Sequence, residues 1–470
     1  FHYATEKEVV ALWVCTQCQK TIPANAKPLC DCGGEARLKE IRGSTPASRF
    51  LVLELAERLP FEPRILGYLR LDPPIPRMHR RTPEGVERDI RERIFPRDWF
   101  HPTYEGGADW QKALDRVNTA AARIARVVVH PDYRSEGFGA LLVRVALEWA
   151  KERGAPEARR EKHLVYTIAQ MARYHPFFEK VGFRYLFDTA SGRPVLFYPL
   201  TEEAEAHLER FLREDPYAKA HGGRLYKPRF GRVPGLPGPI RLAGVHKAYR
   251  SHLDLEGLSR EVQEALLAFG VKARVVERAV LRGASLEIPP GSLVVLAGAS
   301  GAGKTTLLRL LLGEAPDAGE VAVPPGRRVA YIPGEREVDL GEAPILEAVY
   351  RRLKDVGAAI EVLNRVGLSD AVLYRARPHE LSTGQRERFR LALLLAERPD
   401  LLLIDEFAAH LDVPTARRVA LGLGKLCREA GVTLVAATHR PEVVAALDPD
   451  LLVYVGYGGL TTVPRRGPRT

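Results

Sequence analysis

The sequence predicts an α/β protein built of several domains. At 470 residues the chain is longer than one hydrophobic core usually organises, so about two to four domains are expected. Two segments, 123–154 and 292–313, each run from an apolar stretch through a glycine-rich turn into a helical pattern. We expect four consecutive regions: a cysteine-containing segment (1–40), a first α/β domain (41–212), a basic region rich in proline and glycine (213–253) and a second α/β domain (254–470).

The composition is that of a globular protein, with 46% hydrophobic and 27% charged residues. Charged residues interrupt every apolar stretch before it reaches the length of a membrane span, so we expect a cytoplasmic protein without membrane helices. Asparagine and methionine are rare, whereas arginine, glutamate, leucine and proline are frequent. A composition poor in thermolabile side chains predicts a thermophilic source.

The N-terminal region holds two close pairs of cysteines, Cys15 with Cys18 and Cys30 with Cys32. Two such pairs can bring four thiolates around one tetrahedral Zn²⁺, and Gly33 with the following glycine lets the backbone turn beside the metal. The alternative is a pair of disulfides. The pattern resembles a zinc ribbon, in which the Zn²⁺ is structural.

The first glycine-rich turn follows a β-branched run and precedes a helix that begins near Ala140. This order directs backbone amides and the positive end of the helix toward an anion, and Gly137 and Gly139 allow it to approach closely. The spacing Arg134-x-x-Gly137-x-Gly139, the later segment MARYHPFFEKVGF (171–183) and the strand pattern ILGYLRLDPP (65–74) together resemble the GNAT acetyltransferases. The resemblance covers roughly residues 45–200.

This resemblance implies an acyl-CoA site, with acetyl-CoA as the expected donor. The backbone of Val127, Val128 and Val129 would pair with the pantetheine arm, and the turn would bind the pyrophosphate through Arg134, Ser135, Glu136, Gly137, Phe138, Gly139 and Ala140. Direct transfer to an amine needs a general acid and a general base. Phe178 occupies the place of the family's usual tyrosine acid, so Tyr174 and His175 are the candidate acids. No base is assigned, and Glu84, Glu87 and Asp89 are not placed by the sequence.

The second glycine-rich turn, GASGAGKTT, matches the phosphate-binding pattern G-x-x-x-x-G-K-[ST] between Gly298 and Thr305. Lys304 would neutralise the β- and γ-phosphates of ATP, and Thr305 would bind Mg²⁺. The apolar run LLLIDEF ends in Asp405, a second Mg²⁺ ligand, and Glu406, which would polarise the attacking water. The expected nucleotide-binding residues are Gly298, Ser300, Gly301, Gly303, Lys304, Thr305 and Thr306.

The segment LSTGQRER, which begins at Leu381, resembles the signature of the ABC ATPases, with Thr383 in place of a glycine. Asp412 matches the family's D-loop, and His439 its switch histidine. The resemblance covers roughly residues 240–470 and implies that Ser382, Gly384 and Gln385 contact nucleotide. Because the family sandwiches ATP between two subunits, one copy of each motif implies a homodimer, or a heterodimer with another ABC protein.

Two positions depart from the ABC pattern. Gly334 stands where the family usually has a glutamine, and Glu335 follows it as an alternative Mg²⁺ contact. The aromatic residue expected to stack on adenine is Tyr249 or, past a helix-like insertion at 256–269, Val275, which would stack poorly.

The basic region contains no carboxylate between Asp215 and Asp254. Its basic residues alternate with aromatic ones, a pattern that can neutralise phosphates and stack bases. A solvated interdomain linker is the equally open alternative. The residues expected to bind nucleic acid are Arg224, Lys227, Arg229 and Arg232.

The whole arrangement resembles the group described as an ABC ATPase fused to a predicted acetyltransferase. That resemblance describes an arrangement of domains and does not identify a substrate. Our leading hypothesis is an ATP-dependent acyltransferase acting on nucleic acid, with a tRNA base amine favoured over DNA. The alternatives are a DNA or ribosome remodelling ATPase whose GNAT domain only binds, and a protein acetyltransferase.

Overall fold

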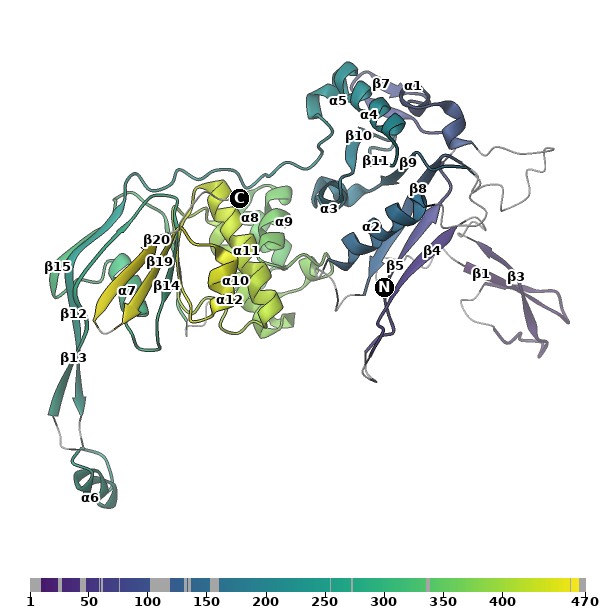
Figure 1. Cartoon of the computed structure of the whole chain (residues 1–470). Helices are drawn as coiled ribbons and strands as arrows, with labels where there is room; N and C mark the ends of the chain where they lie inside the picture. The colour runs from purple at the N-terminus through teal and green to yellow at the C-terminus, as the bar shows by residue number, and fades with distance from the viewer. Residues whose placement is uncertain are drawn as a thin grey trace. The chain divides into compact units, whose positions relative to one another are not determined.

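The computed structural model describes residues 10–23, 28–42, 48–58, 60, 62–75, 77–101, 119–130, 133, 137–152, 160–253, 255–271, 274–334, 339–456 and 458–464. The chain forms two compact units, Phe1–Lys227 and Pro228–Thr470 (Figure 1). Within the described residues, no helix is both long and apolar enough to cross a bilayer.

A small antiparallel sheet opens the first unit. Its strands are β1 (Val10–Cys15), β2 (Thr21–Pro23) and β3 (Ala36–Arg42), in the order β2-β1-β3. Cys15 and Cys18 lie at and after the end of β1, while Cys30 and Cys32 precede β3, so the pairing of these strands brings the two cysteine pairs together.

A six-stranded sheet forms the body of the first unit. It has the order β10-β11-β9-β8-β5-β4, and only β8 and β9 run parallel to each other. The strands are β4 (Arg49–Glu54), β5 (Ile65–Asp72), β8 (Ala121–Val129), β9 (Leu164–Ile168), β10 (Arg184–Asp188) and β11 (Pro194–Pro199).

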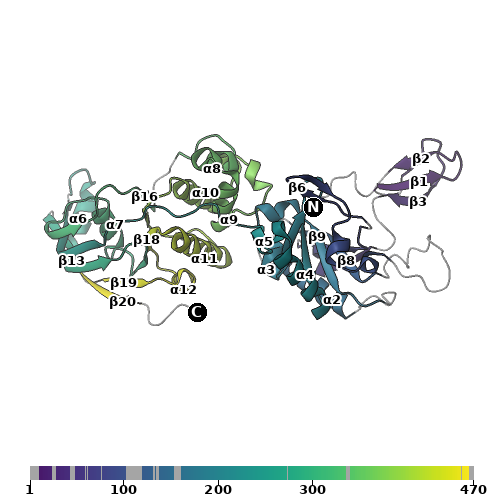
Figure 2. The ribbon, with the colours of Figure 1, turned by 90° about the horizontal axis from the view of Figure 1, so that it is seen from above.

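Helices cover the two faces of this sheet unequally (Figure 2). On one face, α2 (Phe138–Lys151) buries Leu142, Val143 and Ala146 against alternate residues of β5 and β8 and is followed by α3 (Phe177–Val181). On the other face, the half formed by β9, β11 and β10 packs against a second apolar cluster. That cluster comes from α1 (Arg91–Ile94), the 3₁₀ turn η1 (Arg97–Phe100), α4 (Glu202–Glu214) and α5 (Pro216–His221). The remaining short elements are β6 (Arg80–Thr82), β7 (Gly85–Glu87) and η4 (Gln170–Arg173).

The second unit is built on a mostly parallel sheet of order β16-β17-β18-β14-β19-β20. Strands such as β17 are buried on both faces, which explains their continuous apolar sequences. The strands are β14 (Leu293–Ala297), β16 (Val329–Ile332), β17 (Leu401–Ile404), β18 (Thr433–Ala437), β19 (Leu451–Gly456) and the antiparallel β20 (Gly459–Pro464).

Seven helices and two 3₁₀ turns are described in the second unit. The helices are α6 (Arg260–Ala268), α7 (Lys304–Leu311), α8 (Ile345–Leu353), α9 (Val356–Arg365), α10 (Thr383–Ala396), α11 (Val413–Ala430) and α12 (Pro441–Leu447). The turns are η5 (Leu373–Arg375) and η6 (Pro378–Glu380).

An antiparallel sheet of order β13-β12-β15 completes the second unit, with β12 (Ile240–Leu253), β13 (Arg274–Ile288) and β15 (Ala318–Ala322). Figure 1 shows β12 and β13 as a long hairpin with α6 at its tip. The insertion expected between Tyr249 and the next strand is therefore the end of a hairpin, and Tyr249 lies directly opposite Arg278 in the strand register.

The basic region at 213–253 is only partly a connection between units. It contains α5 and β12, and the chain passes from the first unit to the second at Lys227 and Pro228. Phe230, one of its aromatic residues, is 1% exposed and packs in the core of the second unit. The proposed role of this aromatic ring in base stacking is therefore wrong, because the ring is enclosed by protein.

Candidate functional site

The glycine-rich loop of the second unit joins β14 to α7. Gly298, Gly301 and Gly303 all have positive φ angles, and a Cβ at Gly298 would collide with the carbonyl oxygen of Val455. Lys304 Nζ donates to the carbonyl oxygens of Gly298 and Ala299, each at 2.8 Å, so the ammonium group is held inside the loop. This geometry can bind phosphates through backbone amides, the N-terminus of α7 and one cation.

Two acidic residues meet this loop from the end of β17. Asp405 is 7% exposed, and its Oδ2 accepts a hydrogen bond from Thr305 Oγ1 at 2.7 Å. Adjacent Glu406 is exposed and has a φ angle of 49°, a strained conformation for a residue other than glycine. A hydroxyl and a carboxylate at this distance form a donor set that suits Mg²⁺, and Thr305 with Asp405 would hold the ion.

The signature segment lies at the start of α10. Ser382 caps this helix: its side chain accepts from the amide of Gln385, and the Gln385 side chain accepts from the amide of Ser382. A Cβ at Gly384 would lie 3.0 Å from Leu411, so the glycine allows close packing of the segment that leads to Asp412. Asp412 caps α11 through the amide of Thr415, and His439 is exposed after β18.

Arg278 lies beside the phosphate loop but belongs to no sequence motif, so it was not predicted from the sequence. Arg278 on β13 donates from Nη2 to the carbonyl oxygen of Gly301 at 2.9 Å. Because Tyr249 lies opposite Arg278, the hairpin places the aromatic ring on the same side of the strands as this contact. Tyr249 Oη donates to Glu314 Oε1 at 3.2 Å, whereas Val275 lies farther along the hairpin and is 55% exposed. Glu335 lies outside the described residues.

The sheet of the first unit opens where β8 leaves β9. The two strands pair from Ala121 to Ile124, and the last pair is Ile124 with Thr167. Val127, Val128 and Val129 continue along β5 instead. A β-bulge lies between these two parts of β8, opposite Arg70 and Leu71. We call this opening the strand fork.

The turn after β8 leads directly into α2. Gly137 caps the helix with a φ angle of 88°, and a Cβ at Gly139 would lie 3.0 Å from the ring of Phe177. Phe138 and Ala140 lie in the first turn of α2, which begins slightly earlier than expected. Arg134, Ser135 and Glu136 lie outside the described residues.

The residues near α3 differ in their capacity to transfer protons. Phe178 is 6% exposed and packs between Phe177 and Phe183, with ring centroids 4.7 and 5.2 Å away. Burial lowers the pKa of His175 to about 4, with a smaller effect from Lys180. A neutral imidazole cannot serve as an acid near pH 7, so half-buried Tyr174 is the remaining candidate acid.

The three carboxylates considered as possible bases lie in the segment between β6 and α1. Glu87 pairs with Arg80 and Arg93, and Glu84 accepts from Tyr217 Oη. Asp89 has a φ angle of 46°, and its Oδ1 lies 3.8 Å from Nδ1 of His79. Glu87 is thus engaged by two arginines and Glu84 by a tyrosine hydroxyl, and no base is assigned.

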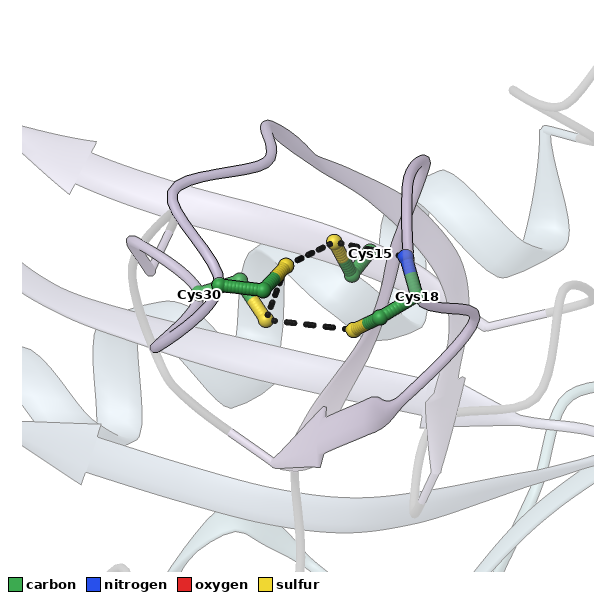
Figure 3. A group of neighbouring side chains, drawn as sticks. Cys15, Cys18 and Cys30 are labelled. Carbon is green, nitrogen blue, oxygen red and sulfur yellow. Dashed lines mark hydrogen bonds between the residues drawn. The ribbon is translucent and has the colours of Figure 1, made fainter.

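The four N-terminal cysteines converge, as Figure 3 shows for Cys15, Cys18 and Cys30. All four Sγ atoms lie within 4.8 Å of one another, and three of the sulfur pairs are separated by 3.4–3.5 Å. Tetrahedral zinc with Zn–S bonds of about 2.3 Å requires sulfur atoms about 3.8 Å apart. None of the four is in a disulfide, and their arrangement is compatible with a zinc ribbon.

The backbone around the cysteines supports this fit. A Cβ at the second glycine, Gly34, would lie 2.7 Å from Cys15 Sγ. The amides of Cys18 and Gln17 donate to this sulfur, and the Cys18 amide is the largest cause that lowers the pKa of Cys15 to about 6. These amides therefore favour a thiolate at Cys15, the form that binds Zn²⁺.

The four basic residues expected to bind nucleic acid are exposed, but the structure does not gather them on one element. Arg224 and Lys227 belong to the first unit, and Arg229 and Arg232 to the second. Arg229 Nη1 lies 3.6 Å from Asp355 Oδ1. One of these four charges is thus already partly balanced by protein.

Comparisons with known proteins agree with this geometry. A family model described as ABC transporter matches residues 281–409, and a model described as acetyltransferase (GNAT) domain matches residues 105–185. These matches confirm the expected α/β multidomain class with an ABC ATPase domain and a GNAT acetyltransferase domain.

Curated relatives and solved structures each match part of the chain. The zinc import ATP-binding protein ZnuC of Ruegeria pomeroyi is 34% identical over 198 residues, which cover 41% of this chain and 75% of that protein. The lipoprotein-releasing system ATP-binding protein LolD 1 of Rhodospirillum rubrum is 35% identical over 193 residues, covering 36% and 84%. The chain spans 56% of the methionine import ATP-binding protein MetN of Mesorhizobium japonicum, at 34% identity over 209 residues and 39% of this chain. The dimeric structure of MJ0796, a bacterial ABC transporter cassette, is 22% identical, with a TM-score of 0.36 over 49% of this chain and 100% of that chain.

Proposed function

This chain belongs to the ABC family of ATP-binding proteins and also carries a GNAT acetyltransferase domain, and we propose that it is an ATP-dependent acyl-CoA acyltransferase acting on nucleic acid. Acetyl-CoA is the favoured donor, and an amine of a tRNA base is the favoured acceptor. The observation that carries the proposal is the presence in one chain of a complete phosphate loop and a strand fork followed by a helix N-terminus.

At the ATP site, the residues of the loop and of the end of β17 have separate roles. Lys304 and the amides before α7 would neutralise the phosphates, and Thr305 with Asp405 would hold Mg²⁺, which would withdraw charge from the phosphates. Glu406 orients the attacking water. Because the chain has one loop and one signature, closure of the site requires a second copy whose Ser382 and Gly384 face the nucleotide, so we propose a homodimer.

On the acyl side, the backbone of Val127–Val129 would pair with the donor, and the N-terminus of α2 would hold its pyrophosphate. The acceptor nitrogen attacks the thioester carbon, so a C–N bond forms and the C–S bond breaks. The nitrogen loses a proton to a base, and Tyr174 gives a proton to the leaving thiolate. The products are the N-acylated base and free CoA.

The short connection between the units supports coupling of the two activities. On the first side, Glu179 of α3 accepts the amides of Leu225 and Tyr226 at 2.9 and 3.1 Å. On the second side, Glu361 of α9, which is 2% exposed, accepts the amides of Arg229 and Phe230 at 2.7 and 3.1 Å. Helix α9 packs against α10, which begins at the signature, so movement of α10 on ATP binding would pull on α3 through only a few residues.

A remodelling ATPase whose GNAT domain only binds a ligand is the second candidate. Burial of Phe178 in the place of the usual acid favours it, because a domain without an acid loses part of its catalytic capacity.

The experiment that separates the candidates combines two variants of the full chain. Incubation with labelled acetyl-CoA, ATP and a tRNA pool, followed by nucleoside mass spectrometry, is expected to show an acylated base. Glu406→Gln should bind ATP and dimerise but hydrolyse it about 100-fold more slowly, by the size of typical losses of a general base.

Gly137→Glu places a carboxylate beside the donor's pyrophosphate and should abolish transfer. Gly137→Asn is its matched control, because asparagine accepts the left-handed backbone without adding charge. ATP hydrolysis should persist in both Gly137 variants. Absence of CoA binding by the parent protein, or transfer unchanged in Gly137→Glu, would leave the remodelling ATPase as the function.

A further inference from the structure

One face of the six-stranded sheet carries a set of residues that the sequence motifs do not mark. Alternate residues of β4, β5 and β8 point away from α2: Leu51, Leu69 and Leu71 pack on the α2 side, so Phe50, Arg70 and Asp72 lie on the opposite side. We call this opposite side the open face.

Two arginines on the open face share one carboxylate. Asp72, which is 6% exposed, accepts from Arg70 Nη2 at 3.0 Å and from Arg123 Nη2 at 2.7 Å. Its other oxygen, Oδ1, accepts from Ser48 Oγ at 2.8 Å. Among the described residues, the cluster therefore holds two guanidinium groups and one carboxylate.

The arginine cluster has further polar capacity. The Nε atoms of Arg70 and Arg123 are buried and have no hydrogen-bond partner in the described part of the chain, although each carries a proton. A third arginine, Arg126, lies directly opposite Arg70 in the pairing of β5 and β8.

Next to the cluster, β4 presents an apolar surface. Phe50 lies opposite Arg70 in the register and is 54% exposed, and Val52 is 48% exposed. The ring of Phe50 lies 6.1 Å from that of Tyr68, at an interplanar angle of 49°. The open face thus combines an exposed aromatic ring with adjacent guanidinium groups, the combination that stacks a base and contacts its phosphate.

The cluster also lies beside the strand fork. Arg123 pairs with Tyr166, one position before the last pair of β8 with β9. The proposed donor leaves its acyl group at this fork, with α2 on the other face of the sheet. An acceptor held on the open face would therefore reach the thioester from the side opposite α2.

From these contacts we infer that the open face binds a single-stranded segment of the nucleic-acid acceptor, with a base stacked on Phe50 and a phosphate at Arg70 and Arg123. The inference rests on the proposed function and names the surface that its acceptor uses. A duplex keeps its bases stacked inside the helix, so it cannot use the exposed ring, and single strands bind more tightly. An acidic peptide would satisfy the arginines but would not need the aromatic ring.

The test measures binding of a fluorescent single-stranded RNA to the full chain by anisotropy, over a series of salt concentrations. Phe50→Ala is expected to weaken binding by about fivefold or more with the salt dependence unchanged, because it removes stacking alone. Arg70→Gln is expected to weaken binding and to reduce the salt slope by about one phosphate contact. Phe50 is exposed, so its truncation leaves the core intact.

Arg213→Gln is the matched control, since it removes one exposed positive charge from α4 of the same unit. It should bind RNA like the parent protein. Equal binding by the parent, Phe50→Ala and Arg70→Gln proteins would overturn the inference, as would tighter binding of a duplex that is insensitive to Phe50.

CoA binding by the same proteins, measured by calorimetry, tests the proposed acyltransferase activity separately from the proposed RNA-binding surface. Loss of RNA binding with normal CoA binding supports the open face. Failure of the parent protein to bind CoA defeats the proposed acyltransferase, whatever the RNA result.

Discussion

The carboxylate of Glu406 lies against the backbone of Gly334. A Cβ added at Gly334 would lie 3.1 Å from Cγ and Oε2 of Glu406 and 3.2 Å from its Cδ. The side chain of Glu406, which follows β17, therefore lies close to where a side chain at position 334 would begin. The missing side chain at Gly334 gives Glu406 the room for its present conformation.

Gly334→Ala should move this carboxylate and slow ATP hydrolysis. Contacts of 3.1 Å are tighter than normal packing, so Glu406 must shift, and a misplaced catalytic group can cost about 10-fold or more in rate. The affinity for ATP should stay within about twofold, because Lys304 and Thr305 are untouched. Steady-state hydrolysis and nucleotide titration measure the two quantities. Gly238→Ala is the control, since a Cβ there meets no heavy atom within 4 Å, and an unchanged rate in Gly334→Ala would show that this contact does not position Glu406.

Removal of zinc should unfold the N-terminal sheet and leave the second unit intact. Strands β1–β3 form too small a sheet to bury a core, so the metal would supply most of their stability. We expect one zinc ion per chain by elemental analysis, lost on substitution of Cys15 or Cys32 by serine. Cys427→Ala should keep the metal, because Cys427 is buried in α11, and burial raises the pKa of its thiol to about 12. Full zinc content in Cys15→Ser would contradict the site.

Burial of His175 should make stability depend on pH in a defined window. Its pKa is about 4 in the folded chain against 6.5 in the unfolded chain, so between these values the unfolded chain binds more protons. Stability from this group is therefore full above pH 6.5 and is lost as pH falls toward 4. At pH 5 the loss is about 2 kcal/mol, from about 1.4 kcal/mol per pKa unit.

The comparison with His175→Gln isolates this group from the other titrating residues. Calorimetric unfolding of both proteins at pH 5 and pH 8 should show a smaller destabilisation at pH 5 in the variant. An equal pH response would mean that His175 stays accessible to protons in the folded chain.

Glu361→Ala should uncouple ATP binding from acyl transfer. It leaves the amides of Arg229 and Phe230 without their acceptor, so the chain near the unit boundary is no longer tied to α9. We expect ATP to stimulate transfer in the parent protein and to lose that stimulation in the variant, with hydrolysis and unstimulated transfer retained. Glu361→Gln can still accept from an amide and should restore part of the stimulation. Full stimulation in Glu361→Ala would exclude this route.

The residues of the ATP site that could be predicted from the sequence are those that belong to contiguous motifs. Lys304 and Thr305 follow their loop within a few residues, and Asp405 and Glu406 end an apolar strand, so local patterns were enough to name them. Arg278 was missed because its contact with Gly301 spans 23 positions of chain and depends on the hairpin. Arg70, Asp72 and Arg123 form one cluster only after β5 and β8 have paired, and each arginine alone looks like an ordinary surface charge.

The α/β domains, the two glycine-rich turns and the four cysteines could be predicted from the sequence, because each depends on residues close together in the chain or on a regular spacing. The folded chain was needed to see that Phe230 is enclosed in the core, that burial lowers the pKa of His175, and that Phe50 is exposed on the strand next to Arg70. The reason is physical: exposure, desolvation and charge balance are properties of the surroundings of a side chain, and those surroundings come from distant parts of the chain.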